Sequence, residues 1–268
     1  MVIHVLHLGL VPYGTALQLQ RTLMELRKAG RVENTLLLLE HPPVITLGRN
    51  AQLSNVIAPP EFLAQRGVEL FEIDRGGDVT FHGPGQLVAY PIFDLRSFEP
   101  GSKIGAVEFV RRLEEVLIRT CGDFGIGAQR IQGLTGVWTY ALPNKPEAKI
   151  AAIGVHISRG VTTHGFALNV NTDLDFFSLI VPCGITGKPV TSMQRELQKT
   201  LPIEEVATAA SRNFGRVFQS QMLWLESLDD LLGEAAVLPG SATPANQDTP
   251  ARPPKELREL HGDGSELA

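Results

Sequence analysis

The chain has 268 residues, of which 43% are hydrophobic and 20% are charged, and its formal net charge is −5. This is an ordinary globular composition, and the acidic balance argues against a nucleic-acid binder. Two cysteines exclude a disulfide scaffold and a paired zinc knuckle, and no apolar run approaches the roughly 18 residues of a membrane span. We therefore expect a cytoplasmic protein that binds neither nucleic acid nor membrane.

Apolar periodicity predicts strands and helices that do not alternate strictly. Continuous apolar runs indicate strands, whereas apolar positions three and four apart indicate helices, with Gly30 ending the first helix and Ser102 capping the second. In chain order, we predict strands at 1–8, 34–40, 44–47, 79–81, 136–140, 149–158 and 161–170, and helices over 13–29, 102–120 and 203–219.

The last two strands flank Arg159 and Gly160 and therefore predict an antiparallel hairpin. Hairpins combined with separate helices favour an α/β fold of the α+β type, in which helices cover a mixed sheet, over repeated βαβ units. We expect one domain over residues 1–233. Residues 236–268 are rich in Pro, Ala, Asp and Gly and have no aromatic residue, which is typical of a disordered tail.

A glycine-rich run, RGGDVTFHGPGQ at residues 75–86, is the first candidate for a binding site. Glycine has no Cβ and tolerates positive φ, so the backbone could lie against a ligand, with Arg75 and His82 as polar contacts. Two tight turns around a short strand explain the same composition equally well. The run matches neither a dinucleotide fingerprint nor a phosphate-binding loop.

A lysine opens the second candidate motif, KIAAIG at residues 149–154. Small side chains on one face of this strand leave room for a slot beside it. A lysine at a strand end is usually solvated, which is the simpler interpretation of Lys149. The functional alternative is an ammonium group that serves a nearby thiolate.

Cys183 lies between a proline and a glycine in the run VPCG, at residues 181–184. Such a position indicates a tight loop and makes the thiol a candidate nucleophile. Free cysteine is also among the most buried residue types, so packing is the competing interpretation, and it is the one we favour for Cys121 at a helix end. His164, at the start of an apolar strand, is either structural or a partner of the thiol, although no papain-like or caspase-like signature surrounds Cys183.

Together with Gly-Val-Trp at 136–138, these blocks resemble, in the same order, the motifs of the lipoyl(octanoyl) transferase family, the octanoyl-acyl-carrier-protein:protein N-octanoyltransferases. The resemblance spans about residues 5–220. It implies the fold of biotin and lipoate protein ligases, a catalytic pair of Cys183 and Lys149, and neither cofactor nor metal. It also implies an acyl-binding tunnel lined by Arg75, Gly76, Gly77, Asp78, Val79, Thr80, Phe81, His82, Ala152, Ile153, Gly154, Gly165, Phe166 and Ala167.

The reaction implied by the resemblance moves an octanoyl group from octanoyl-acyl carrier protein to a lysine of lipoyl domains, through a thioester on Cys183. The implied acceptors are the lipoyl domains of 2-oxoacid dehydrogenase complexes and the glycine cleavage H protein. An ATP-dependent lipoate or biotin-type ligase on the same fold is the alternative, but adenylation needs no nucleophilic cysteine. A non-catalytic acyl-binding module is a further alternative, and it needs neither Cys183 nor Lys149.

Overall fold

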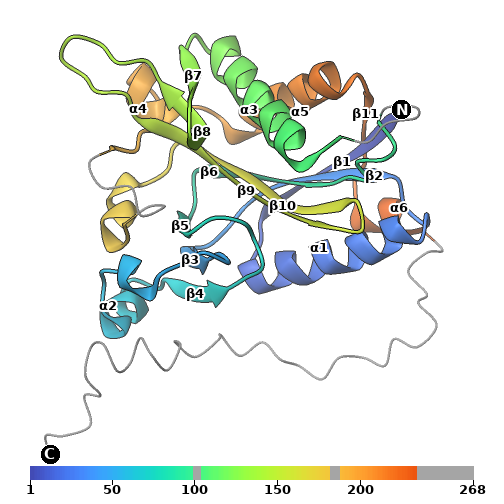
Figure 1. Ribbon diagram of the computed structural model, residues 1–268, viewed down its shortest axis with the longest axis horizontal. Helices are drawn as coiled ribbons and strands as arrows, with labels where there is room; N and C mark the ends of the chain where they lie inside the picture. Colours follow the sequence, from blue (N-terminus) through green and yellow to red (C-terminus); the bar gives the residue numbers. More distant parts are fainter. Residues whose placement is uncertain (99–103, 182–187, 234–268) are drawn as a thin grey trace, which may run out of the picture.

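An eight-stranded mixed sheet organises the protein in the computed structural model, which describes residues 1–98, 104–181 and 188–233 (Figure 1). Cys183 and the predicted tail at 236–268 lie outside the described residues. In spatial order the strands are β11 (Gln221–Trp224), β1 (Val2–Leu10), β2 (Asn34–Glu40), β6 (Gln86–Ile92), β10 (Val161–Asn169), β9 (Lys149–Ser158), β8 (Leu134–Thr139) and β7 (Ala128–Ile131).

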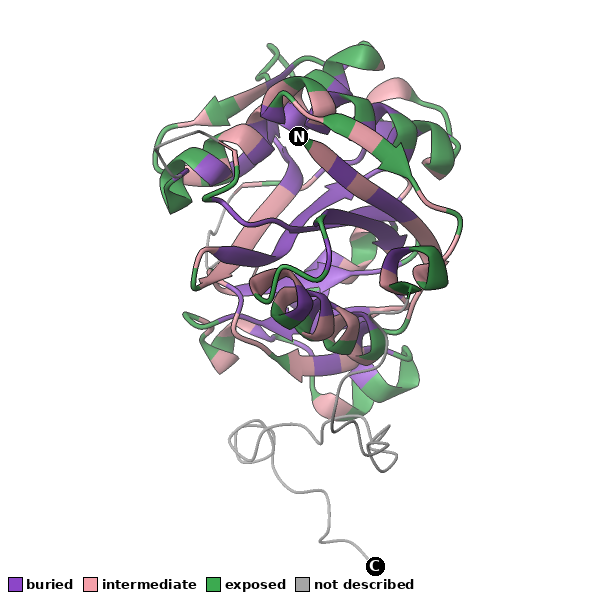
Figure 2. Ribbon diagram, turned by 90° about the vertical axis from the view of Figure 1, so that its right-hand side faces the viewer, coloured by how far each residue is buried: buried purple, intermediate pink, exposed green. Residues whose placement is uncertain are grey.

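Helices cover both faces of this sheet (Figure 1). Helices α3 (Ala106–Asp123) and α5 (Ile203–Phe218) pack on one face, and α1 (Tyr13–Lys28) packs on the other. The buried strands between the helical layers form the core of the molecule, as Figure 2 shows. Because both faces are covered, β2 and β6 read as nearly continuous apolar runs.

A second sheet of three strands forms a smaller layer beside the first. Its order is β4 (Glu69–Glu72), β3 (Val44–Leu47) and β5 (Val79–His82). This sheet has its own apolar cluster. The remaining elements are the 3-10 helices η1 (Leu53–Asn55) and η2 (Leu174–Leu179) and the short helices α2 (Pro60–Gln65), α4 (Met193–Leu197) and α6 (Leu228–Leu232).

The predicted helices and strands are largely confirmed, with one correction at α3. The helix begins after its N-cap, Gly105, whereas the predicted cap, Ser102, lies outside the described residues. Just before the cap, the amide of Ile104 donates to the carbonyl of Leu95 at 3.1 Å. Val107, one of the apolar positions at helical spacing in this segment, is expected on the buried face but is 75% exposed. Cys121 is fully buried in the core, which confirms its packing role.

Strand β6 is the main element that the sequence prediction missed. It runs antiparallel to both β2 and β10 and therefore holds the two halves of the large sheet together. Pro91 within it argues against a central strand. In the structure the missing N–H is tolerated, and the hydroxyl of Thr162 donates to the carbonyl of Pro91 at 2.6 Å.

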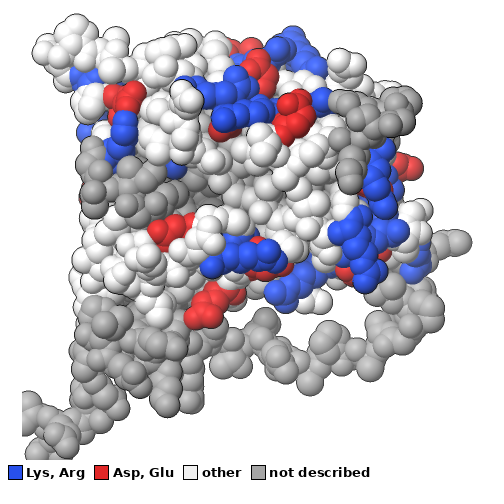
Figure 3. Space-filling view, viewed as in Figure 1, with Lys and Arg blue, Asp and Glu red and all other residues white. Residues whose placement is uncertain are grey.

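Charged side chains on the face shown in Figure 3 gather in separate patches, in which Lys and Arg are mixed with Asp and Glu. A broad area without charged side chains lies between them. Among the described residues, the charged patches on this face are therefore of mixed sign. Within the described ranges, no helix is both long enough and apolar enough to cross a membrane.

Candidate active site

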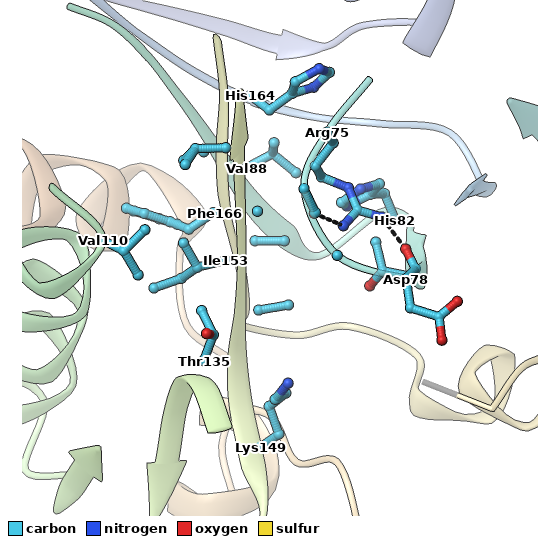
Figure 4. A pocket seen from close by; sticks show the side chains of 18 of the residues that line it. Arg75, Asp78, His82, Val88, Val110, Thr135, Lys149, Ile153, His164 and Phe166 are labelled. Carbon is cyan, nitrogen blue, oxygen red and sulfur yellow. Dashed lines mark hydrogen bonds between the residues drawn. The ribbon is translucent and has the colours of Figure 1, made fainter. Parts of the chain in front are cut away.

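A cavity of about 510 Å³ lies where the loop at residues 75–78 crosses strands β9 and β10 (Figure 4). It is lined by residues from all three motif stretches that the sequence singled out within the described residues: the glycine-rich run, the start of β9 and the middle of β10. Strand β6 contributes Val88 and Tyr90, and α1 contributes Tyr13. The fold therefore joins segments that are far apart in the chain into one pocket.

The loop over the cavity lies directly against β9 because Gly154 has no side chain. The amide of Gly76 donates to the carbonyl of Val155 at 3.1 Å. A Cβ on Gly154 would lie only 2.7 Å from the carbonyl oxygen of Gly76, and it would also meet the side chain of Arg75. The absence of a side chain at Gly154 therefore allows the backbone of the loop to lie close to strand β9.

Arg75 and Asp78 hold this loop in shape. The guanidinium of Arg75 donates to the carbonyls of Asp78 at 2.7 Å and Gly76 at 2.8 Å, and both bonds are drawn in Figure 4. The carboxylate of Asp78 accepts from the amide of Val79 at 2.7 Å and from the side chain of Asn55 at 2.6 Å. Both side chains therefore bond to protein groups that build the cavity wall.

The floor of the cavity is made by small residues on neighbouring strands. Ala152 and Ala167 are direct partners across β9 and β10, and Gly154 and Gly165 form the next such pair on the same face. Gly165 is also required by the strand beyond it, because a Cβ there would lie 2.1 Å from the carbonyl oxygen of Ala89. The predicted slot beside the strand is present in the structure.

Two predicted lining residues, Ile153 and Phe166, direct their side chains to the opposite face of the sheet. Figure 4 shows both of them beside Val110 of α3, across the strands from Arg75 and His82. Phe166 stacks on Phe214 of α5, with ring centroids 5.8 Å apart. These two residues therefore pack against the α3 and α5 layer, and together with Val110 they line the part of the cavity on that face.

The four residues of β5 also point alternately to the core and to the cavity. Val79 and Phe81 point into the apolar cluster of the small sheet, where Phe81 stacks on Phe176 at 4.8 Å. Thr80 and His82, on the opposite side of the strand, line the cavity. The predicted stretch 75–82 thus contributes alternate side chains to the cavity and to the core.

His82 presents an acceptor to the cavity. The side-chain amide of Gln86 donates to Asn169 at 2.9 Å, which fixes its oxygen toward His82, so Nδ1 of His82 donates to that oxygen at 2.8 Å. Among the described residues, Nε2 of His82 has no hydrogen-bond partner. Burial lowers the pKa of His82 to about 3, so the imidazole is neutral at physiological pH.

Lys149 is buried, with 8% of its surface exposed, so the simpler interpretation of a solvated strand end is wrong. It lies at the start of β9 and lines the cavity at the end away from His164 (Figure 4). Its backbone bonds to residues on the C-terminal side of the cysteine loop: its amide donates to Pro189 at 2.8 Å and its carbonyl accepts from Thr191 at 2.9 Å.

Cys183 lies outside the described residues, but the chain on either side of it borders the cavity region. Before it, the amide of Val181 donates to the carbonyl of Asn55 at 2.7 Å, and Asn55 is bonded to Asp78. After it, Lys188 forms an ion pair with Glu147, two residues before Lys149. Both flanks are therefore anchored to segments next to the cavity.

The sequence analysis missed a carboxylate–imidazole pair at the other end of the cavity. Asp74 accepts a hydrogen bond from Nε2 of His164 at 2.9 Å and lies 3.6 Å from Nε2 of His156. Burial lowers the pKa of His164 despite the hydrogen bond to Asp74, which raises it. The pair joins the loop over the cavity to β10. His164 also has a positive φ of 56°, which only a few per cent of non-glycine residues adopt and which the sequence does not predict.

Within the part of the chain that the structure describes, no group of three or more His, Cys, Asp or Glu side chains could hold a metal ion. The polar side chains around the cavity include those of Arg75, Asp78, His82 and Lys149. The arrangement offers an apolar floor, a buried ammonium at one end and a neutral imidazole acceptor on the wall. Such a cavity suits an extended apolar chain with a polar reactive end.

The chain matches one protein family and is similar in sequence to several known proteins. Residues 12–215 match the family described as the lipoyl protein ligase A/B catalytic domain. An octanoyltransferase of Koribacter versatilis is 64% identical over 265 residues, covering 99% of this chain and 99% of the relative. An octanoyltransferase of Acidobacterium capsulatum is 61% identical over 243 residues, covering 89% of this chain and 99% of the relative.

Solved structures with a similar fold are lipoate protein ligases. A bi-partite lipoate protein ligase from Thermoplasma acidophilum gives a TM-score of 0.65 at 20% identity, covering 85% of this chain and 87% of that one. Lipoate-protein ligase A bound with ATP gives a TM-score of 0.64 at 18% identity, covering 85% and 89%. At these identities the likeness establishes the fold alone, and it confirms the fold predicted from the sequence.

Proposed function

Because the chain belongs to the lipoyl protein ligase A/B catalytic domain family and matches octanoyltransferases over nearly its whole length, we propose that it transfers an octanoyl group from octanoyl-acyl carrier protein to a lysine of lipoyl domains. We propose further that the group passes through a thioester on Cys183. The observation that carries this proposal is a buried lysine, Lys149, at one end of a cavity floored by Ala152 and Ala167.

The strand along the cavity floor is long enough to accommodate an eight-carbon chain. From Lys149 to Gly154 the strand advances five residues (154 − 149), or roughly 17 Å at about 3.3 Å per residue. An extended octanoyl chain spans roughly 9 Å, given carbon–carbon bonds of about 1.5 Å. A chain whose carbonyl lies near Lys149 would therefore cross the pair of Ala152 and Ala167. Burial of seven methylene or methyl groups at about 0.8 kcal/mol each gives roughly 5 to 6 kcal/mol of recognition.

Two transfer steps account for all atoms without an additional reactant. In the first, the thiolate of Cys183 attacks the carbonyl carbon of the donor thioester, a new C–S bond forms, and the carrier thiolate leaves and takes up a proton. In the second, the uncharged amine of the acceptor lysine attacks the acyl-enzyme. An amide bond forms, the amine loses a proton, and the Cys183 thiolate is released.

Lys149 is proposed to favour the thiolate form of Cys183. A free thiol with a pKa near 8.5 is only about 3% ionised at pH 7. An ammonium about 4 Å away contributes roughly 4 kcal/mol of attraction at an effective dielectric constant near 20, and a third of that raises the ionised fraction to about a quarter. We propose that Lys149 also relays the proton that the acceptor amine releases.

His82 is proposed to bind the polar end of the acyl substrate. Its neutral imidazole presents Nε2 to the cavity as a hydrogen-bond acceptor, and Nδ1 is held by Gln86. A neutral acceptor suits an N–H group of the donor or the attacking amine. Arg75, Gly76, Gly77 and Asp78 form the loop that covers the chain.

The partners follow from the reaction. We propose octanoyl-acyl carrier protein as donor, and as acceptors the lipoyl domains of 2-oxoacid dehydrogenase complexes and the glycine cleavage H protein. A reducing cytoplasm, which keeps a nucleophilic thiol free, is the proposed location. Residues 1–233 are proposed as the catalytic unit.

An ATP-free transfer assay tests the proposal. Purified protein is mixed with octanoyl-acyl carrier protein and a lipoyl domain, without ATP, and the mass of the lipoyl domain is followed. We expect a gain of one octanoyl group, lost in Cys183→Ser. Transfer only from free octanoate plus ATP would instead identify the ligase alternative, and no transfer from either donor would support the non-catalytic module.

A further inference from the structure

We infer that Trp138 is a positioning residue, whose indole ring holds the Lys149 ammonium in place for acyl transfer. The inference rests on the proposed function, because it assigns a role beside the proposed catalytic lysine. Trp138 belongs to the Gly-Val-Trp motif at 136–138, which the proposed reaction leaves without a role. Three independent features of the strands β8 and β9 support it.

The first feature is register. Trp138 and Lys149 are direct partners across β8 and β9, so their side chains stand on the same face of the sheet. The Nζ of Lys149 lies 4.9 Å from the centroid of the indole ring. A cation within about 6 Å of an aromatic centroid is attracted to the ring face, and tryptophan provides the strongest such face. Trp138 is 1% exposed, so this attraction acts away from water.

The second feature is the space that Gly136 leaves for the lysine. A Cβ on Gly136 would lie 3.3 Å from Cε of Lys149 and 2.6 Å from the carbonyl oxygen of Ala151. Its φ of 118° also favours glycine. Gly136 and Trp138 therefore border the same lysine side chain, one by leaving room and the other by contact. A lysine fixed in this way gives up rotamer freedom, and the contact with Trp138 offsets part of that loss.

The third feature is the indole N–H. Nε1 of Trp138 is buried, and no acceptor among the described residues bonds to it. An unpaired buried donor is unfavourable, and phenylalanine would avoid it while still filling much of the same space. Packing alone would therefore favour phenylalanine here. The larger π face of tryptophan, next to an ammonium, explains the presence of tryptophan instead.

A second ammonium also lies over the same ring. Nζ of Lys188 is 5.7 Å from the centroid, and Lys188 is ion-paired with Glu147. Any effect of changing Trp138 could therefore act through Lys188. The variant Lys188→Met separates the two contacts, because it removes the second ammonium and leaves the contact between Trp138 and Lys149.

The test compares Trp138→Phe and Trp138→Leu with Trp224→Phe, a matched substitution on the exposed edge strand β11. Two readouts are the rate of octanoyl addition from octanoyl-acyl carrier protein, followed by intact mass, and the pH midpoint of Cys183 alkylation without substrate. We expect acylation to fall about threefold in Trp138→Phe and at least about tenfold in Trp138→Leu, with an alkylation midpoint moved to higher pH. Trp224→Phe should stay within about twofold of the unmodified protein, and Lys188→Met should lose less activity than Trp138→Leu.

The outcomes separate this inference from the proposed function. If the unmodified protein forms no acyl-enzyme, the proposed function fails. The pH midpoints of Cys183 alkylation would still show whether Trp138 positions the Lys149 ammonium. If it forms the acyl-enzyme and both Trp138 variants match it in rate and midpoint, the inference alone is overturned. A full loss reproduced by Lys188→Met also overturns it. Should Trp138→Leu not fold, Trp138→Phe decides, because its melting temperature is expected within a few degrees of the original.

Discussion

Ala152 and Ala167 stand directly opposite each other across β9 and β10, and both line the floor of the cavity. Directly opposite residues in an antiparallel pair have Cβ atoms roughly 5 Å apart, so a larger side chain at either position fills the same space. In the proposed enzyme this space holds the middle of the acyl chain.

The variant Ala167→Leu is therefore expected to shift the chain-length preference. Leucine would occupy the volume of about two or three methylene groups, each worth about 0.8 kcal/mol or roughly fourfold in binding. We expect transfer of octanoyl groups to fall at least about tenfold, and transfer of hexanoyl or butyryl groups to fall much less. The measurement is kcat/KM for acyl carrier proteins loaded with chains of each length.

The neighbouring strand provides the complementary variant. Val88 is the partner of Ala167 on β6 and lines the same cavity. Val88→Ala should widen the floor and favour decanoyl over octanoyl groups. An equal loss of activity toward all chain lengths in both variants would contradict the proposed placement of the acyl chain.

Gly154→Ala should damage the site although it adds only one methyl group. The new Cβ would lie 2.7 Å from the carbonyl oxygen of Gly76, so the loop over the cavity must move. We expect a loss of stability of about 1–3 kcal/mol and a larger loss of transfer activity. Urea unfolding and the ATP-free assay measure the two effects.

Gly122→Ala is the matched control for this substitution. Gly122 lies within α3, and an added Cβ there would meet nothing within 4 Å. Alanine in a helix is favoured over glycine by roughly 0.5–1 kcal/mol, so the control should be as stable as the original or more so, with full activity. Equal behaviour of the two variants would show that the loop does not depend on contact with β9.

The sequence predicted the strands that carry the site better than it predicted the direction of each side chain. KIAAIG and THGFALNV were recognisable because their apolar runs and small residues set them apart, and both strands lie where predicted. Ile153 and Phe166 could not be assigned to a face, because a strand covered on both sides is apolar throughout and its alternation is hidden. Their contacts with Val110 and Phe214 depend on α3 and α5, which are far away in the chain.

Other parts of the site depended on contacts that no local pattern encodes. Strand β6, a central strand that contains Pro91, was not predicted, yet it provides Val88 and Tyr90 to the cavity. Asp74 and His164 are 90 residues apart, and only the packing of the loop on β10 brings them to 2.9 Å. The Gly-Val-Trp motif could be recognised in the sequence. Its contact with Lys149 could not be predicted, because that contact depends on the register of β8 and β9.

The two cysteines should differ sharply in reactivity. Burial raises the pKa of Cys121 to about 12, so almost none of it is thiolate at neutral pH. We expect iodoacetamide at about pH 7 to modify one thiol per folded chain, at Cys183, with Cys121 modified only after unfolding. Peptide mapping of the alkylated protein identifies the site. Rapid labelling of Cys121 in the folded protein would contradict its place in the core.

Two buried histidines should make the folded protein less stable in acid. Burial lowers the pKa of His41 to about 4 and that of His82 to about 3. In the unfolded chain both take up protons below about pH 6.5, so the unfolded state binds more protons and unfolding becomes easier as the pH falls from there toward 4. Each histidine lowers the free energy of unfolding by about 1.4 kcal/mol per pH unit in this range.

Urea unfolding at about pH 7 and about pH 5 measures this dependence. His82→Asn removes one of the two protonation sites and should reduce the slope by about 1.4 kcal/mol per pH unit. A stability that stays constant across this range, or rises as the pH falls, would show that the two imidazoles are already protonated in the folded protein.

The formation of a thioester on Cys183 is the central claim, and intact-mass measurement with peptide mapping tests it most directly. The protein is mixed with octanoyl-acyl carrier protein in the absence of any acceptor, with Lys149→Ala as a parallel sample. We predict one octanoyl group per chain, mapped to Cys183 and released by hydroxylamine, and formed at least about tenfold more slowly in Lys149→Ala. An unmodified protein, or an octanoyl group on another residue, would contradict the proposed mechanism.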